Sequence, residues 1–227
     1  MKKIIFMFVL VIFFAVSMAS FVYAQLTVGE TKIERSMAVL EEMASREDQA
    51  GAFSQLLPRA EGIVIYPKLV NIGWGIGIMF GDGIVLRKDR NTGQWYGPAF
   101  IELKTGSVGL QAGIQQVSVV LLLMDEKGLN VFKRTDFEIG ADISVAPGPL
   151  GDSLQSTVDF NDSIYSYSYS KGIYAGFTLS GSVIRADKKA NRNFYGESIT
   201  GEEIMNNNKV NNEVALGLVR LIREISQ

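Results

Sequence analysis

Apolar residues recur at helical intervals through residues 31–57, and Thr31 and Glu34 are spaced as in a capping box. This pattern predicts an N-terminal helix, followed by a second short helix that ends at Pro58. We expect the apolar stripe to pack against the rest of the domain. The alternative is an amphipathic helix that lies on a membrane, but such helices usually carry Lys and Arg on the polar face, and this segment is mainly acidic.

From Gly62 to Phe194 the pattern changes to short apolar or alternating runs separated by glycine, proline, asparagine and aspartate, which is typical of antiparallel strands. The run from Val117 to Met124 is too short to span a bilayer, so it is predicted to be a strand buried on both faces. Hairpin turns are predicted at Asp82-Gly83 and at residues 91–93. The predicted strands cover residues 63–66, 72–80, 84–88, 99–104, 117–124, 139–144, 164–170 and 173–185.

The last segment of the chain returns to a helical pattern. Thr200 and Glu203 are again spaced as in a capping box, and apolar residues recur at helical intervals over residues 210–225. The sequence therefore predicts a C-terminal helix and an α+β fold, in which N-terminal and C-terminal helices flank an antiparallel β-rich body. The apolar stripe of this helix is Val210, Val214, Leu218, Leu221 and Ile225.

The beginning of the chain has the pattern of a secretory signal. Two lysines precede a long uncharged stretch, which ends with small residues before Gln25. We predict that residues 1–24 are a signal peptide and that residues 25–227 form a single domain, exported to the periplasm or the medium. An uncleaved membrane anchor is the alternative, because about 20 apolar residues can also span a bilayer.

The chain contains neither cysteine nor histidine. Disulfides, zinc sites of the usual kind, Ser-His-Asp triads and Cys-His dyads are therefore excluded. Ser168 and Lys171 have the spacing of a penicillin-binding motif, but Ser168 lies in a strand pattern and the accompanying Lys-Thr-Gly match comes earlier in the chain. We therefore predict no catalytic residue, no metal and no cofactor, and the net charge of −2 argues against nucleic acid as a partner.

Glycines alternate with large apolar residues through Gly73–Gly77. No helical pattern follows, so this is not a phosphate-binding loop but a strand with one bare face. We expect another element to pack closely on that face. A groove in which an acyl chain lies is the alternative.

Tyr165, Tyr167 and Tyr169 alternate with serines, which places three rings on one face of a predicted strand. The simplest interpretation is an aromatic ladder in the core or on the sheet. An exposed ladder would instead suit lipid headgroups, since tyrosine favours the interface between apolar and wet surroundings. These tyrosines, with the nearby Lys171, are candidate lipid contacts.

A basic stretch follows the last predicted strand. Arg185, Lys188, Lys189 and Arg192, with Asp187 among them, carry a local charge of about +3 and are predicted to lie in a loop. Each basic residue near an anionic leaflet contributes about 1 kcal/mol, so the stretch would attract a membrane weakly and would need an apolar partner. A solvated loop without a ligand is the alternative.

Acidic residues gather around Gly140–Gly151 but fit no EF-hand spacing, so we interpret them as turn and surface residues. They are Asp136, Glu138, Asp142, Asp152 and Asp159.

Residues 36–205 resemble the SYLF-domain family, found in bacterial secreted proteins and in eukaryotic endocytic and actin-patch adaptors. The segments that carry the resemblance, in order, are residues 60–67, 73–83, 95–100, 106–113, 140–149, 165–168, 171–176 and 193–196.

The resemblance implies a non-enzymatic phospholipid-binding domain. Eukaryotic members are expected to bind phosphoinositides, and the fungal adaptors actin. For an exported bacterial chain we expect an anionic phospholipid such as phosphatidylglycerol or cardiolipin, bound by a monomer at the membrane surface of the envelope. The alternative is a structural or adaptor protein of the envelope whose surface binds another protein.

Overall fold

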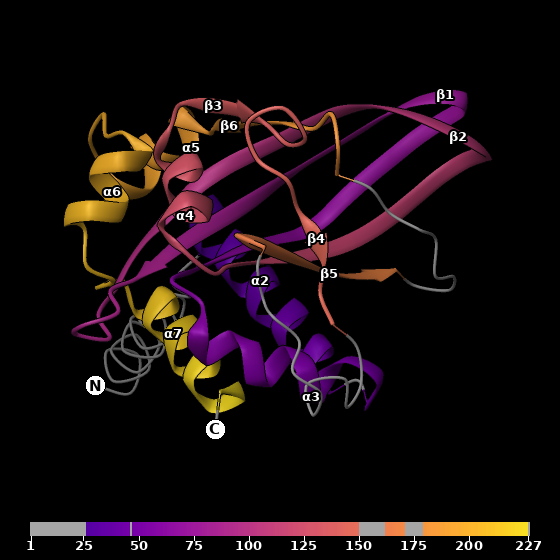
Figure 1. The fold of residues 1–227 in the computed structure, drawn as a ribbon. Coiled ribbons are helices and arrows are strands. Elements are labelled where there is room, and N and C mark those ends of the chain that lie inside the picture. The colour runs from indigo at the N-terminus through magenta and orange to yellow at the C-terminus, as the bar shows by residue number, and fades with distance from the viewer. Residues whose placement is uncertain (1–25, 46, 150–161, 171–178, 227) are drawn as a thin grey trace, which may run out of the picture.

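The computed structural model describes residues 26–45, 47–149, 162–170 and 179–226 (Figure 1). The predicted signal peptide lies outside these residues and stays a prediction. The helices are α2 (Val28–Ala44), α3 (Glu47–Leu56), the 3₁₀ turn η1 (Leu57–Arg59), α4 (Glu126–Lys133), α5 (Lys188–Tyr195), α6 (Gly201–Asn207) and α7 (Glu213–Ile225). The strands are β1 (Gly62–Lys88), β2 (Trp95–Leu123), β3 (Asp136–Glu138), β4 (Ala146–Pro147), β5 (Ile164–Ser170) and β6 (Val183–Ala186).

One long antiparallel hairpin, β1 and β2, replaces five of the separately predicted strands. Its turn lies at residues 89–94, where the Asp89 carboxylate accepts hydrogen bonds from the backbone N–H groups of Asn91 and Thr92, and Gly93 has a φ of 67°. The predicted turn at residues 91–93 is therefore confirmed. The one predicted at Asp82-Gly83 is wrong, because β1 continues to pair with β2 through both residues.

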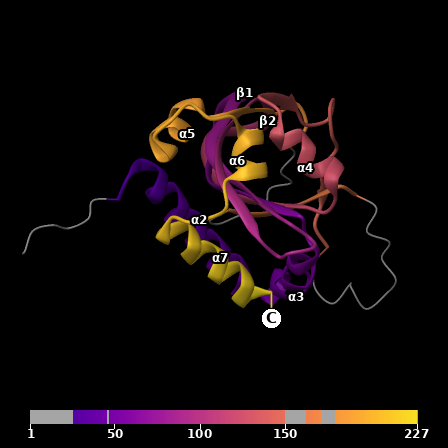
Figure 2. The same ribbon diagram turned by 90° about the vertical axis from the view of Figure 1, so that its left-hand side faces the viewer.

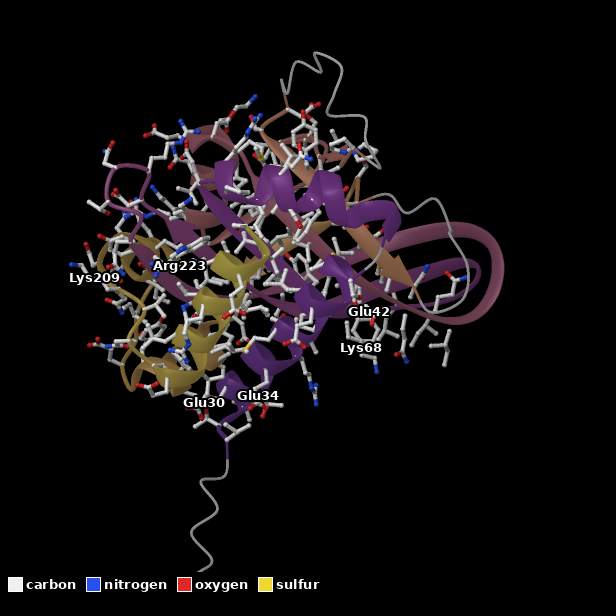
Figure 3. All side chains as sticks on the ribbon, turned by 90° about the horizontal axis from the view of Figure 1, so that it is seen from below. Glu30, Glu34, Glu42, Lys68, Lys209 and Arg223 are labelled. Carbon is white, nitrogen blue, oxygen red and sulfur yellow. The ribbon has the colours of Figure 1, made fainter. Side chains whose placement is uncertain are left out.

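Glycines at positions 81 and 83 let β1 fold back against itself. A Cβ on Gly83 would lie 2.5 Å from Cδ1 of Tyr66 and 2.9 Å from the carbonyl oxygen of Ile65, and a Cβ on Gly81 would overlap the carbonyl oxygen of Lys68. The two halves of β1 are thus in direct contact, and the hairpin curls instead of lying flat. The far end of the curl projects beyond the helices (Figures 1 and 3).

The remaining strands extend the sheet from β2. The first half of β2 pairs with β6, which pairs in turn with β3, and the second half of β2 pairs with β5. Because β4 joins β5 in parallel, the sheet is mixed. The predicted strand over residues 139–144 is wrong: Asp142 accepts the Glu138 N–H and pairs with Arg134 at 2.9 Å, so these residues form a turn.

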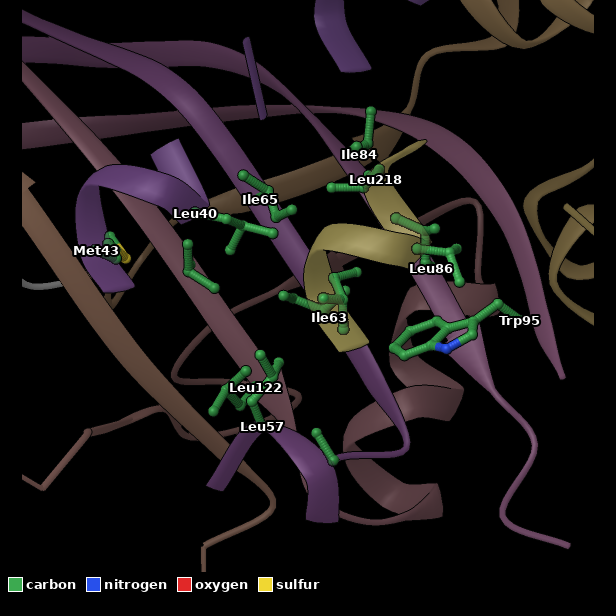
Figure 4. Close-up of a cluster of buried hydrophobic side chains, with 14 of the residues drawn as sticks. Leu40, Met43, Leu57, Ile63, Ile65, Ile84, Leu86, Trp95, Leu122 and Leu218 are labelled. Carbon is green, nitrogen blue, oxygen red and sulfur yellow. The ribbon is translucent and has the colours of Figure 1, made fainter. Parts of the chain in front are cut away.

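Over most of its area the sheet is covered on both faces, and the described part of the chain forms two hydrophobic cores. Helices α2, α3 and α7 cover one face, where Leu40, Ile65 and Leu122 pack together (Figure 4). Helices α4 and α6 cover the other face, within the curl, over Leu121 and Leu103. The prediction of a strand with two buried faces is confirmed, because Val119 to Leu123 have no exposed surface.

Helices α2 and α7, near the two ends of the chain, lie side by side below the sheet (Figure 2). The capping box of α2 is formed by Thr27 and Glu30 rather than by Thr31 and Glu34, so the helix begins one turn earlier than predicted. The capping box at Thr200 and Glu203 is confirmed, but it opens the separate helix α6. Val210 lies between α6 and α7, and hence outside the helix to which it was assigned.

Helices at both ends of a β-rich body confirm the predicted α+β class. In the part of the chain that the structure describes, every helix is too short or too polar to cross a bilayer.

Candidate functional site

The basic stretch is an ordered strand end and helix rather than the loop that was predicted. Arg185 lies on β6, opposite Glu102 in the register with β2. Lys188, Lys189 and Arg192 lie on α5. The loop prediction is wrong because Asp187 caps the helix, its carboxylate accepting the backbone N–H of Ala190 at 2.9 Å. We call Arg185, Lys188, Lys189 and Arg192 the basic surface.

Buried contacts on the other side of α5 hold the basic surface in place. Asn191 is 1% exposed, and its side chain both accepts from the N–H of Phe100 at 2.8 Å and donates to its carbonyl at 3.1 Å. The ring of Phe194 packs edge-on against that of Phe100, with 5.2 Å between centroids. The Tyr195 hydroxyl donates to the carbonyl of Pro98, so the whole length of α5 is attached to β2.

All four cations of the basic surface are exposed, and within the described ranges none has an ion-pair partner. Lys188 and Lys189 occupy the first turn of α5, which contains no acidic residue. A helix N-terminus carries a partial positive charge, so lysines there oppose the helix dipole. Their placement adds positive potential outside the helix without stabilising it.

Lys32 neutralises the acids behind the basic surface. Its ammonium group lies 3.0 Å from Asp187 and 3.3 Å from Asp82, and it also faces the ring of Phe100. The carboxylates of Asp82, Glu102 and Asp187 lie close enough together to suggest a cation site. Because the Lys32 amine already contacts two of them, the cluster is an ion-pair network that joins α2, β1 and α5.

Next to the basic surface, a part of the sheet that no helix covers forms a groove of about 410 Å³. Its floor is the run of neighbouring strands β1, β2 and β6, on which Phe80, Lys104 and Val183 lie directly opposite one another. The groove is lined by Ile78, Met79, Phe80, Glu102, Lys104, Thr105, Gly106, Gly181, Val183 and Arg185.

The groove combines exposed apolar side chains with charges. Ile78 and Phe80 are 59% and 38% exposed. Lys104 pairs with Glu102 at 3.1 Å, and Arg185 lies at the edge that the groove shares with the basic surface. Residues 78–80 of β1 and Arg185 of the basic surface, which are far apart in the sequence, therefore meet on one surface.

The tyrosine ladder belongs to the core where the structure describes it. Tyr165 and Tyr167 are 6% and 2% exposed, and the ring of Tyr167 packs edge-on against Phe53 at 5.1 Å. Burial, and to a lesser extent Tyr165, raises the pKa of Tyr167 above its ordinary value. The core interpretation is confirmed for these two residues, which leave little surface exposed for a lipid headgroup. The side chain of Tyr169 and all of Lys171 lie outside the described residues.

Further apolar side chains are exposed where the hairpin curls. Ile72 and Ile114 are direct partners across β1 and β2, and they are 41% and 68% exposed. They lie outside the groove, further along the paired strands than Ile78 and Gly106.

The predicted surface role of the acids is confirmed for Asp136, Glu138 and Asp142, which are exposed. Asp152 and Asp159 lie outside the described residues.

Sequence reasoning missed most of the groove. Lys104 and Phe80 were correctly assigned to strands, but no pattern in the sequence indicates that the strand of Lys104 pairs with that of Phe80 on one edge and with β6 on the other. The alternation of Ile78 and Phe80 with glycine was visible, but it does not show which face stays uncovered.

Comparison with known proteins defines the class. Residues 104–225, more than half of the chain, match the Ysc84 family model, described as "Las17-binding protein actin regulator". The chain therefore belongs to the Ysc84 (SYLF) family, a family of binding proteins, and the resemblance described above is confirmed.

Individual relatives come from yeast and animals. The chain is 29% identical over 155 residues to Protein YSC84 of Saccharomyces cerevisiae, a match that covers 66% of this chain and 33% of that protein. It is 31% identical over 145 residues to SH3 domain-containing YSC84-like protein 1 of Xenopus laevis, covering 63% of this chain and 43% of that one. LAS seventeen-binding protein 3 of S. cerevisiae is 28% identical over 155 residues, 66% of this chain and 33% of that protein. The chain thus spans less than half the length of these relatives.

Proposed function

We propose that this chain is a non-enzymatic module that binds anionic phospholipid at a membrane surface, and that the basic surface makes the first contact. The observation that carries the proposal is the group of four exposed cations without ion-pair partners among the described residues. Three of them lie on α5, which buried contacts attach to β2, and Arg185 lies on β6.

The arrangement of these cations favours an external anion over a structural role. Lysines in the first turn of a helix oppose its dipole, and residues that break a local rule are commonly functional. Four basic residues near an anionic leaflet supply roughly 4 kcal/mol, which is enough for reversible docking and too little for permanent attachment.

The predicted signal peptide completes the proposal. A chain exported by residues 1–24 meets phosphatidylglycerol or cardiolipin as the anionic lipids of a bacterial envelope. We therefore propose a peripheral protein on the outer side of the inner membrane.

Charge reversal tests the basic surface directly. In the chain from Gln25 to Gln227, the double change Lys188→Glu and Lys189→Glu should weaken binding to phosphatidylglycerol vesicles by at least about 30-fold, because two contributions of about 1 kcal/mol are lost and the new carboxylates are repelled by the anionic leaflet. It should also flatten the salt dependence of binding, since fewer exposed charges remain to be screened. Vesicle sedimentation at low and high salt measures both effects.

The matched control reverses two exposed cations on other elements, Lys127 on α4 and Arg220 on α7. Its net charge equals that of the test variant. Equal loss of binding in the two variants would mean that only the net charge matters, which would contradict a specific role for the basic surface. Undiminished binding of the test variant would also contradict that role.

A protein partner is the second candidate function. The family is described by binding to Las17, and one relative is named for the same partner, so protein binding has a precedent in the family. This candidate would replace the first if vesicles of every composition failed to bind while one envelope protein formed a stoichiometric cross-linked complex, lost on reversal of Lys188 and Lys189.

A further inference from the structure

The groove is the uncovered continuation of a sheet face that elsewhere forms the core. Along β1, Ile84 and Leu86 are buried beneath the helical layer, Asp82 pairs with Lys32, and the next residues on that face, Phe80 and Ile78, are exposed. No helix contributes a residue to the lining of the groove, so in the described part of the chain the apolar face continues uncovered beyond the contact between Asp82 and Lys32.

The middle of the groove floor has no free strand edge to which a further β-strand could be added. The middle strand of the floor, β2, is paired along one edge with β1 and along the other with β6, from Ile101 to Lys104. The backbone groups that would bind a peptide in extended form are therefore already used. What the floor offers is apolar side-chain surface, which suits a chain without polar groups of its own.

The charges at the rim suit one phosphodiester. Lys104 and Arg185 bring two positive charges and Glu102 brings one negative charge, so the lining has a net charge of about +1. An arginine fork binds phosphate oxygens well, and Arg185 has no ion-pair partner among the described residues. The groove thus complements a molecule with a single negative charge next to an apolar chain.

We propose that the groove binds one phospholipid molecule from the bilayer, with its phosphodiester at Arg185 and Lys104 and an acyl chain along Phe80 and Ile78. This inference rests on the proposed function, because the basic surface must first bring the groove to a membrane. Binding then has two components: docking by α5, which salt weakens, and lipid insertion into the groove, which salt leaves largely unchanged.

The experiment uses the chain from Gln25 to Gln227 and phosphatidylglycerol vesicles at about 1 M salt. At this salt concentration the Debye length is about 3 Å, so the attraction between exposed charges and the membrane is largely screened. Phe80→Ser should lower the remaining binding about tenfold, as expected for loss of an aromatic side chain that the bound acyl chain would cover. The control is Ile114→Ser, which removes a more exposed apolar side chain from outside the groove and should have little effect. Thermal unfolding establishes that both variants are folded.

A second measurement does not depend on loss of binding. With both native tryptophans replaced by phenylalanine, Phe80→Trp places the one remaining fluorophore in the groove. Bromine on the acyl chains should quench its fluorescence, and glycerol phosphate, which has the headgroup chemistry without the chain, should neither displace the vesicles nor change the emission.

Three results would overturn the inference: salt-resistant binding that Phe80→Ser leaves unchanged, an equal loss in the Ile114 control, or no quenching of Trp at position 80. The two proposals fail separately. Binding that vanishes at high salt but persists at low salt would contradict lipid binding in the groove and leave the proposal for the basic surface standing. No binding at any salt would contradict both proposals.

Discussion

Gly83 and Tyr66 show how one missing Cβ shapes the sheet. The Tyr66 ring is fully buried against Gly83, and burial raises the pKa of its hydroxyl well above the ordinary value. Neither residue is in a turn. Glycine is needed here for a close approach within one strand, so a pattern that usually marks a turn marks a curl instead.

Replacing Gly83 with alanine should therefore destabilise the fold. The new methyl group would push against the Tyr66 ring and the Ile65 carbonyl, and overpacking of this kind costs typically 1–3 kcal/mol. The free energy of unfolding in urea measures the loss.

Gly106 on β2 is the control, because nothing lies within 4 Å of the Cβ it would gain. Gly106→Ala should be neutral or slightly stabilising. Equal destabilisation by both substitutions would mean that the contact with Tyr66 is not the cause.

At the scale of elements, a few polar side chains join helices that are remote in sequence. Glu30, in the first turn of α2, accepts a hydrogen bond at 3.0 Å from the side chain of Asn212, the residue that caps α7. This bond, followed by those from Thr27, holds the pKa of Glu30 below 4.5.

The sign of the resulting pH dependence follows from that direction. A carboxylate whose pKa is lower in the folded state stabilises the protein above its unfolded pKa, and this contribution disappears as the pH falls through the folded pKa. The advantage of the native chain over Glu30→Gln, measured as the free energy of unfolding, should be present at pH 7 and shrink as the pH is lowered below 4.5.

Glu34→Gln removes the same charge from the same helix without touching Asn212. If this variant showed the same pH-dependent loss, the bond between the two helix starts would not be responsible.

The arrangement of the basic surface depends on helix α5. As a loop, Lys188, Lys189 and Arg192 would have no set arrangement, whereas α5 presents them from a helix attached to β2 through Asn191. This rigidity lowers the entropy lost when the cations meet a membrane.

At the scale of the whole molecule, one sheet lies between two hydrophobic cores. Leu121 and Leu122 are neighbours on β2, yet they lie in different cores. The two cores share the sheet, so damage to either should weaken the same cooperative unit.

Leu121→Ala and Leu122→Ala should each lower the free energy of unfolding by about 2–5 kcal/mol, because each leaves a cavity in a packed core. Ile114→Ala, on the exposed end of the hairpin, should change it little. A single shared transition in chemical denaturation is expected, and two separate transitions would show that the cores unfold independently.

Local patterns in the sequence were sufficient for the α+β class, the turn at residues 91–93, the buried strand at the end of β2 and the capping box at Thr200. Each of these depends on neighbours within a few residues, or on the burial of one apolar run. The family could also be identified from the order of its motifs.

Only the tertiary structure decided how far the strands continue and which surface is left open. Asp82 and Gly83 have turn chemistry, but pairing with β2 and contact with Tyr66 keep them in a strand. The tyrosines alternate as a surface ladder would, yet the helix that carries Phe53 covers Tyr167. The groove exists because β6, some 80 residues after Lys104, pairs beside it where the helical layer ends. Periodicity along the chain assigns side chains to a face, but long-range packing determines whether that face is covered.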